Sequence, residues 1–590
     1  MPSATVSTST LVQLTPSQAK RLYGAIHLFC ALKDVLPQSS KPTVSDDESI
    51  VTTPDDDRAL YRCFVNKIAQ ICDTKHGGDT VTSAMILQPG QVEYWIASNS
   101  RNKGQMAGVK KFLSEDILKE LAGLKGRDLA DEAKVSAVSE VLLKKVIAHC
   151  RWRLHNYVKR LVNNLGPCIE SCAKGSDTEV TMAARLRELL PIAQRAVASW
   201  PHDIISFTEH TLLLLLTLKK FYTSSFASFL RDKAPPLTDS HSSSPPSPWA
   251  ETRHAIGRFH SYTLAIRVFL AARRKWPDLF ESPEVIPYPS PPKLPSPLQI
   301  KERMCTGKAL LHRLTPDAAV HSAYDSLLPQ LQALEFDTRL KEAIKDPKSV
   351  TTVHAEVTLL STLRREVLSP SPGREDAHWD FFMEDKFGRY IGCSKPTCLL
   401  CDMYFAAFPV EVHRRKGHGN FYPKWRVADI EGPQVNGVVE WLVSDRKNVV
   451  EEMIKTLRKE VTGVLVERRG LRGSRYDSRA TPSDPFGSVV TAAAGSVRGG
   501  LTEGRLMQAQ VGHLGSDGGV GGSVHGRGRR DRLVLEEVEE VEDENDGGEG
   551  ECMEGESVEE VDRLMGQLSV SGGRREGEEG DDDDEGGAKV

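Results

Sequence analysis

The sequence predicts an α/β fold that is split by a large helical insertion and followed by a disordered C-terminal tail. The first observation is a pair of β-rich runs within residues 53–102. The second is a His-x-Glu and a Cys-x-x-Cys motif, each of which opens a helical segment within residues 349–430. The third is helical apolar spacing over the intervening residues 103–348. A chain of 590 residues is long enough for about three or four domain-sized units.

Residues 1–52 are predicted to form one helix and a linker. The run Thr15-Pro16-Ser17-Gln18 has the pattern of a capping box, in which two side chains satisfy backbone groups at a helix start. Residues 1–18 lack the pattern of a signal peptide, and the 11 cysteines show no paired framework. We therefore expect an intracellular protein, cytoplasmic or nuclear, and not a secreted one.

Residues 53–102 are predicted to supply the first part of the α/β core. A helix is expected over Arg58–Cys72, with Thr53 as its N-cap and a proline at its first position. The runs Thr80–Leu87 and Val92–Ser98 are rich in β-forming residues, and a Pro-Gly pair separates them. This pattern predicts a β-hairpin.

Residues 103–348 are predicted to be a helical insertion with two Pro/Ser-rich solvated connectors, Ala234–Trp249 and Ser282–Pro297. The apolar run Leu212–Leu218 is too short to cross a membrane, so it is expected to be the fully buried part of a helix. We expect no membrane association, and the insertion is a candidate surface for a protein partner. The helical spacing is clearest over Val109–Leu124, Ala130–Leu165, Val180–Ser199, Asp203–Leu230, Arg253–Arg274 and Leu310–Ile344.

The first helix of the second core part, residues 349–430, begins at the His-x-Glu motif. Apolar residues recur at helical spacing from Val353 to Val367. His354 and Glu356 therefore lie in the first turn of this predicted helix.

The second helix of this part is predicted at the Cys-x-x-Cys motif, after a short strand over Phe387–Gly392. Thr397 is expected to be its N-cap. Cys398 and Cys401 then lie one helical turn apart, so both sulfur atoms can face one metal ion. A helix N-terminus also favours the thiolate over the thiol, and the thiolate is the form that binds zinc.

A closing helix is predicted within residues 431–469, and residues 470–590 are predicted to be a disordered, Gly-rich acidic tail. Between Asp531 and Val590, 24 acidic residues face 5 basic ones, a net charge of −19. Because the whole chain carries −5, residues 1–530 carry about +14. A basic region is compatible with a polyanionic ligand. The tail would shield that region, compete with the polyanion, or only aid solubility.

The two motifs together indicate a metal site. Zinc sites are usually tetrahedral, so one histidine and two cysteines leave one position open for water. His354, Cys398 and Cys401 are the predicted ligands. Glu356 is the predicted proton carrier, because a carboxylate beside such a site can move protons to and from the water.

The segment from His354 to Cys401 resembles the cytidine-deaminase-like superfamily. Residues 392–401 (GCSKPTCLLC) are most similar to its Orientia-type branch, a deaminase-like family that is widespread in fungi. The resemblance implies a three-layer α/β/α core and Zn²⁺ as cofactor. It also implies hydrolysis of the C–N bond of a nucleobase amine, which leaves a carbonyl and releases ammonia. One departure is Thr397, because the usual pattern has proline directly before the first cysteine.

The resemblance also implies roles for individual residues. His354, Cys398 and Cys401 would be the zinc ligands, and Glu356 would be the proton shuttle. Asn99 would bind substrate, because such deaminases often have an asparagine at the end of the second hairpin strand. The alternative for Asn99 is a turn residue that caps the strand.

A rival interpretation is a closed structural zinc site in a non-catalytic binding or scaffold module. Four protein ligands would leave no open position and would prevent hydrolysis. Those ligands would be Cys393, Cys398, Cys401 and either His413 or His418. Metal binding through His354 would instead support the enzyme. In that case Cys393 is expected to be a buried thiol beside the site. A third class is a deaminase fold that has lost activity and serves as a scaffold.

Basic and aromatic side chains are frequent around the two motifs, as a nucleotide or a single-stranded nucleic acid would require. The alternative is that the rings belong to the core and the charges to a solvated surface. The basic residues are Arg364, Arg365, Lys386, Arg389, Lys395, Arg414, Arg415, Lys416, Lys424 and Arg426. The aromatic residues are Trp379, Phe381, Tyr390, Tyr404, Phe421, Tyr422 and Trp425.

Overall fold

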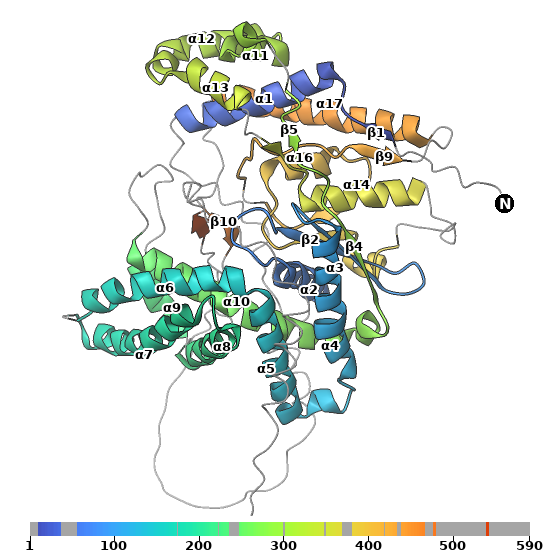
Figure 1. Ribbon diagram of the computed structural model, residues 1–590. Coiled ribbons are helices and arrows are strands. Elements are labelled where there is room, and N and C mark those ends of the chain that lie inside the picture. The colour runs from blue at the N-terminus through green and yellow to red at the C-terminus, as the bar shows by residue number, and fades with distance from the viewer. Residues whose placement is uncertain are drawn as a thin grey trace, which may run out of the picture.

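The computed structural model describes residues 10–36, 56–173, 175–221, 224–234, 247–298, 301–346, 350–368, 380–417, 419–432, 438–466, 476–479 and 539–541. It is a mixed α/β protein with mostly helical content (Figure 1).

A five-stranded mixed sheet lies at the centre, with strand order β4-β3-β2-β7-β8. Strands β2 (Thr82–Leu87) and β3 (Glu93–Ser98) form the predicted hairpin, and the turn between them contains a glycine with φ of +117°. On the other side of β2 lie β7 (Tyr390–Cys393) and then β8 (His413–Arg414). β2 is antiparallel to both of its neighbours, whereas β7 and β8 are parallel.

The prediction that Ser282–Pro297 is a solvated connector is wrong in part, because this stretch contains the edge strand β4 (Glu284–Tyr288). β4 pairs in parallel with β3, and β5 (Leu294–Pro295) pairs with β6 (Val350–Thr351). A proline is tolerated in an edge strand, where one side of the backbone needs no partner. Residues 103–348 therefore contribute a strand to the central sheet as well as helices.

The two faces of the sheet belong to two hydrophobic cores. Successive side chains of a strand point to opposite faces. The even-numbered apolar residues of β2 and β3 join one core, and the odd-numbered apolar residues join the other. Helix α2 (Asp57–Cys72) covers the first face, and α14 (Ala355–Leu368) covers the second. Helix α16 (Leu399–Ala407) packs beside α14.

A cap of helices lies beyond α14 and α16 (Figure 1). Helix α1 (Pro16–Val35) begins with the predicted capping box, in which Thr15 is the N-cap and Gln18 completes the box. It packs against α17 (Val438–Leu465), the predicted closing helix, which also contacts α16. The other helices of this cap are α11 (Gly307–Leu314), α12 (Ala318–Ala333) and α13 (Phe336–Lys345).

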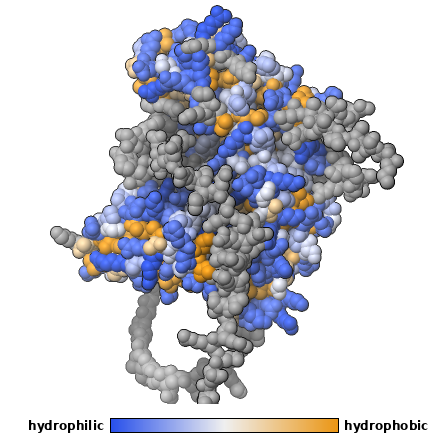
Figure 2. All heavy atoms as spheres, viewed as in Figure 1, coloured by the Kyte–Doolittle hydropathy of each residue, from blue (hydrophilic) through white to orange (hydrophobic). Residues whose placement is uncertain are grey.

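The remaining helices of the insertion pack on the α2 side of the sheet. Within α8 the predicted complete burial is wrong: Leu213 and Leu216 are exposed, because the helix lies at the surface and presents one face to water. Figure 2 shows hydrophobic side chains among hydrophilic ones over this part of the surface. These helices are α3 (Lys103–Lys111), α4 (Lys119–Gly123), α5 (Glu132–His149), α6 (Arg151–Ser171), α7 (Asp177–Ser199), α8 (Ile204–Phe221), α9 (Ser224–Lys233) and α10 (Pro248–Lys275).

The predicted N-cap of helix α2 is also wrong. Its N-cap is Asp56, whose side chain accepts a hydrogen bond from the backbone of Ala59, and not Thr53, which lies outside the described residues. At the other end of α2, the carboxylate of Asp73 pairs with Arg153 of α6 at 2.5 Å, and both side chains are almost fully buried. This ion pair fastens the insertion to the core.

Two short ladders complete the described chain. Strand β1 (Thr10–Val12) pairs with β9 (Ile430–Gly432), and β10 (Tyr476–Arg479) pairs with β11 (Glu539–Val541). The rest of the predicted tail, residues 470–590, lies outside the described residues. Within the described part of the chain, none of the helices has the length and apolar character that crossing a membrane requires.

Candidate metal centre

The His-x-Glu motif opens α14, as predicted. The carbonyl of His354 accepts the N–H of Thr358 at 2.9 Å, which is the first hydrogen bond of the helix. The N–H of Ala355, the first residue of the helix, donates to Oδ1 of Asn99 at 2.8 Å. Glu356 follows in the first turn and is 4% exposed. The end of the β-hairpin therefore fixes the start of the helix that carries the motif.

The Cys-x-x-Cys motif opens α16, but with a different cap from the predicted one. The N-cap is Cys398, whose Sγ accepts the backbone N–H of Cys401 at 3.4 Å, and Thr397 lies one position before the cap. A sulfur atom can take this place because an N-cap needs only an acceptor that reaches the first turn. The first thiol therefore belongs to the residue that caps the helix.

The two helix starts bring one histidine and two cysteines together. The ligand atoms of His354, Cys398 and Cys401 all lie within 4.8 Å of one another. Nδ1 of His354 is 3.5 Å from Sγ of Cys398 and 3.3 Å from Sγ of Cys401. Two sulfur atoms and one imidazole nitrogen suit a borderline-soft ion such as Zn²⁺ and not Mg²⁺ or Ca²⁺, which prefer oxygen ligands.

The two thiols have opposite pKa shifts. Burial opposes ionisation of Cys398, but the hydrogen bond from the Cys401 thiol and the charge of His354 outweigh it and lower the pKa of Cys398 to about 6. Burial, followed by the interaction with Cys398, raises the pKa of Cys401 well above its usual value. Cys398 is therefore the more acidic of the two thiols, and the thiolate is the form that binds a metal.

Glu356 is a buried carboxylate beside this group. It lies two positions after His354 in the first turn of α14, and its charge opposes the ionisation of Cys393, Cys398 and Cys401. Its Oε2 is fully buried and finds no hydrogen-bond partner among the described residues. A buried polar atom without a partner is destabilising, so such an atom calls for an explanation other than folding.

Cys393 and His413, two candidate ligands of the closed alternative, lie outside this group. Cys393 ends β7 as a buried thiol, and burial raises its pKa to about 12, with the charge of Glu356 acting in the same direction. His413 lies in β8, with Nε2 3.9 Å from a carboxylate oxygen of Glu411. Within the described residues, the group that can hold a metal contains His354 and neither Cys393 nor His413. His418 lies outside the described residues.

Asn99 is placed beside the motif but is engaged with the backbone. Its Oδ1 accepts from Ala355, and its Nδ2 donates to the carbonyl of Gly78 at 2.8 Å. It is 7% exposed.

One residue that the sequence did not single out for the metal site is Trp425. Its indole Nε1 donates to Sγ of Cys401 at 3.3 Å, and its side chain is fully buried. Trp425 is one of the aromatic residues predicted to lie around the motifs, and no local pattern indicates a hydrogen bond to a residue 24 positions away. The half-buried Tyr422 has its ring centroid 6.0 Å from that of His354.

The aromatic side chains around the motifs are mostly part of the core. Phe381, Tyr390, Tyr404, Phe421 and Trp425 are buried, and Trp379 lies outside the described residues. Several of the basic side chains form ion pairs within the protein, namely Arg364 with Asp445, Arg389 with Glu384, Arg414 with Asp402, and Arg426 with Asp429.

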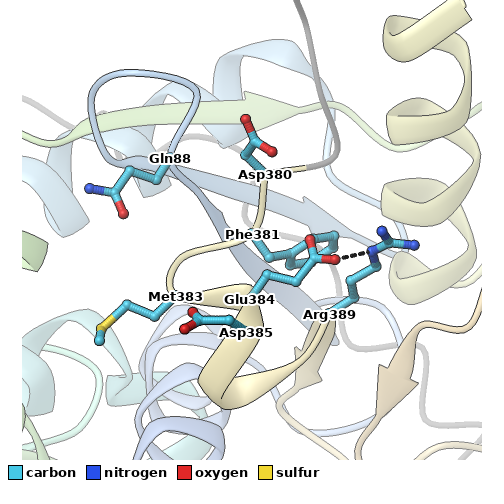
Figure 3. Close-up of a pocket in the computed structure, with 7 residues that line it drawn as sticks. All are labelled: Gln88, Asp380, Phe381, Met383, Glu384, Asp385 and Arg389. Atoms are coloured by element: carbon cyan, nitrogen blue, oxygen red, sulfur yellow. Dashed lines mark hydrogen bonds and ion pairs between the residues drawn. The ribbon is translucent and has the colours of Figure 1, made fainter.

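A separate hollow of about 790 Å³ lies beside the hairpin turn. Figure 3 shows the ion pair of Glu384 and Arg389 at its wall. Its lining includes none of the residues of the metal group. The lining residues are Gln88, Asp380, Phe381, Met383, Glu384, Asp385 and Arg389.

Comparison with known proteins points to the same segment. Residues 353–429 match a deaminase family described as OTT_1508_deam-like deaminase. The match spans both motifs and therefore all three residues of the metal group. No curated protein and no solved structure gave a significant match.

Proposed function

We propose that this protein is a zinc-dependent hydrolytic deaminase that acts on a nucleobase in a nucleotide or nucleic acid. The observation that carries the proposal is the position of Glu356 beside the His354, Cys398 and Cys401 group, because the buried Oε2 of this carboxylate has no hydrogen-bond partner among the described residues. The deaminase-family match over residues 353–429 supports it. A structural zinc site would have no use for such a carboxylate.

The three ligands fit a catalytic zinc site. Catalytic zinc usually has three protein ligands and keeps one position open, whereas structural sites have four. Zinc bound here would act as a Lewis acid that makes water a stronger nucleophile at neutral pH. His354, Cys398 and Cys401 would hold it, and the N-termini of α14 and α16 would orient these ligands.

Glu356 would carry the protons of the reaction. Deamination removes one proton from the attacking water and adds protons to the ring and to the departing amine, which leaves as ammonia. Oε2 of Glu356 is the free acceptor for the first transfer, and the same group then donates. This role accounts for a carboxylate oxygen that folding leaves without a partner.

Two further residues would contact the base. Nδ2 of Asn99 has two hydrogens, of which the hydrogen bond to Gly78 uses one, so the second is available for a substrate group. The ring of Tyr422 lies against His354 and would stack on the base. Both assignments rest on proximity to the metal group.

We propose that the partner is a nucleotide or single-stranded nucleic acid, that the protein acts inside the cell in the cytoplasm or nucleus, and that the helical insertion can dock a protein. The basic charge of residues 1–530 supports an anionic ligand.

The alternative is a non-catalytic module with a closed structural site. It requires Cys393 together with His413 or His418 as ligands. The placement of His354 between the two thiols favours the open site, because Nδ1 of His354 lies within 3.5 Å of both sulfur atoms.

The proposal is tested by ammonia release with Glu356→Gln, using cytosine and adenine nucleotides and single-stranded RNA and DNA as substrates. We expect the variant to keep its zinc and to lose roughly 10²–10⁴-fold in turnover, as is typical of a general acid–base group. The control is Glu366→Gln, in the last turn of the same helix and half-buried, which should keep wild-type turnover. Wild-type turnover in Glu356→Gln would contradict the mechanism.

A further inference from the structure

We infer that Trp425 is a positioning residue for the metal site, whose indole N–H holds the sulfur of Cys401 and limits its electron donation to the metal. The inference rests on the proposed function, because it requires that His354, Cys398 and Cys401 bind the ion. Trp425 is not itself a ligand, but it would influence how strongly the sulfur of Cys401 donates to the ion.

The contact is a hydrogen bond in a dry environment. Nε1 of Trp425 lies 3.3 Å from Sγ of Cys401, and both side chains are fully buried. An indole has one N–H and no acceptor, so its direction toward the sulfur is unambiguous. In a low-dielectric interior such a bond is stronger than in water.

The two thiols receive their hydrogen bonds from different sources. Cys398, the N-cap of α16, accepts the backbone N–H of Cys401 at 3.4 Å, so the Cys-x-x-Cys turn supplies this donor by itself. The donor to Cys401 comes from the side chain of Trp425, 24 positions along the chain. Only the second donor can be removed by substitution without changing a ligand.

The backbone around Trp425 is fastened to both ligand-bearing segments. Thr352, two positions before His354, donates to the carbonyl of Lys424 at 2.8 Å and accepts from the N–H of Arg426 at 2.9 Å. The N–H of Leu399, between the two cysteines, donates to the carbonyl of Asn420 at 2.9 Å. The segment 420–426 therefore spans the starts of α14 and α16, and Trp425 lies where they meet.

The ring is also held by aromatic packing. The Trp425 ring meets that of Tyr404 in α16 edge-on, with centroids 6.2 Å apart. Tyr404 in turn lies 3.0 Å, oxygen to oxygen, from the hydroxyl of Ser361 in α14. The indole is thus fixed by packing and by backbone pairing, as a group that orients a metal ligand must be.

A hydrogen bond to a metal-bound thiolate draws electron density from the sulfur. The ion then keeps more positive charge for the group in its open position, and the buried negative charge on sulfur is better compensated. Loss of the N–H should therefore raise the energy of the sulfur lone pair. It should also leave the buried negative charge on sulfur less compensated, and this loss of compensation should weaken metal binding. Groups that support metal ligands typically contribute about 10–100-fold to affinity or activity.

The test uses Co²⁺, because its sulfur-to-metal charge-transfer band reports on thiolate donors directly. Purified full-length wild type and Trp425→Phe are titrated with Co²⁺. We expect the variant to bind one equivalent roughly 10–100-fold more weakly. We also expect its charge-transfer band to move to longer wavelength. An unchanged band and affinity in Trp425→Phe would overturn the inference.

The matched control is Trp95→Phe. Trp95 is 2% exposed, belongs to the same hydrophobic core, and donates its indole N–H to Glu93 at 2.8 Å. This variant loses the same volume and the same kind of hydrogen bond, but not at a sulfur atom, so its cobalt spectrum should match that of wild type. A shift of the band in Trp95→Phe equal to that in Trp425→Phe would assign the effect to lost packing and overturn the inference.

Other outcomes separate the inference from the proposed function. If wild type binds no Co²⁺ and no Zn²⁺, the proposed function fails together with the inference. If wild type binds Co²⁺ with a sulfur band that Trp425→Phe does not change, the inference alone fails. Should Trp425→Phe not fold, as shown by circular dichroism, incorporation of β-(3-benzothienyl)alanine at position 425 removes the N–H at nearly constant shape, and the same shift is expected.

Discussion

Oδ1 of Asn99 accepts the backbone N–H of Ala355 at 2.8 Å, across 256 positions of sequence. This hydrogen bond joins the end of the β-hairpin to the start of the helix that carries His354 and Glu356. It resembles an N-cap supplied by a distant residue, because it satisfies one of the free N–H groups at the start of α14. The insertion between the two core parts therefore does not separate the halves of the site.

Substitution of Asn99 should cost stability and metal affinity together. Asn99→Ala leaves the Ala355 N–H and the Gly78 carbonyl without their partner, so we expect a loss of about 1–2 kcal/mol in the free energy of unfolding. The control is Asn102→Ala, which removes the exposed N-cap of α3. Denaturant unfolding should show a loss in both variants, but zinc affinity should fall only in Asn99→Ala. Equal zinc affinity in the two variants would count against the link.

The ion pair of Arg153 and Asp73 should be one of the strongest ties between insertion and core. Removal of one partner leaves a buried charge, so Arg153→Ala should lose about 3–5 kcal/mol in the free energy of unfolding. An exposed pair, Lys134 with Asp128, provides the comparison, and Lys134→Ala should lose at most about 1 kcal/mol. Chemical denaturation of both variants measures the difference. Similar losses would mean that the buried pair has no special weight.

Acid should destabilise the fold through buried histidines. Burial lowers the pKa of His27 to about 4 and, with the charge of Arg267, that of His260 to about 3. The unfolded chain binds protons near pH 6.5, so the contribution of these residues is complete above that pH and is lost as the pH falls toward 4. In this window each of the two histidines should lower the free energy of unfolding by roughly 1.4 kcal/mol for each pH unit of acidification.

The His27 contribution can be isolated by comparing variants. His27→Phe removes one titrating group from the core. Its free energy of unfolding relative to that of wild type should therefore rise steadily as the pH falls from 6.5 to 4. Unfolding curves at several pH values measure this difference. A difference that does not change with pH would show that His27 does not remain neutral in the folded state.

Metal removal should lower thermal stability, because an ion that binds only the folded state stabilises it by mass action. At a free zinc concentration 100 times the dissociation constant, this stabilisation is about 2.7 kcal/mol. Chelation should therefore lower the Tm of wild type, and Cys398→Ala should have a low Tm that chelation leaves unchanged. A Tm of wild type that is insensitive to chelator would exclude a bound ion in the purified protein.

Local patterns in the sequence predicted the features whose causes are local. The capping box of Thr15 and Gln18 and the hairpin at Pro89 and Gly90 each depend on a few neighbouring residues, and the structure contains both. The two short motifs also identified the three residues that come together, because each motif fixes its own spacing on a helix start.

Features that depend on distant partners were missed or misplaced. Strand β4 contains Pro287 and becomes a strand only because it lies at the sheet edge beside β3. Cys398 replaces Thr397 as N-cap, and Thr397 instead forms a β-bridge with Gly417, 20 positions along the chain. Trp425 was grouped with stacking rings, whereas it is buried against Cys401. In each case the deciding contact is remote in sequence.

The central claim is that His354, Cys398 and Cys401 hold one zinc ion in an open site. The most direct test is zinc stoichiometry of purified wild type, His354→Ala and the double variant His413→Ala/His418→Ala, measured side by side. We predict about one equivalent in wild type and in the double variant, and none in His354→Ala. A full equivalent in His354→Ala, with loss in the double variant, would show a closed structural site and contradict the account.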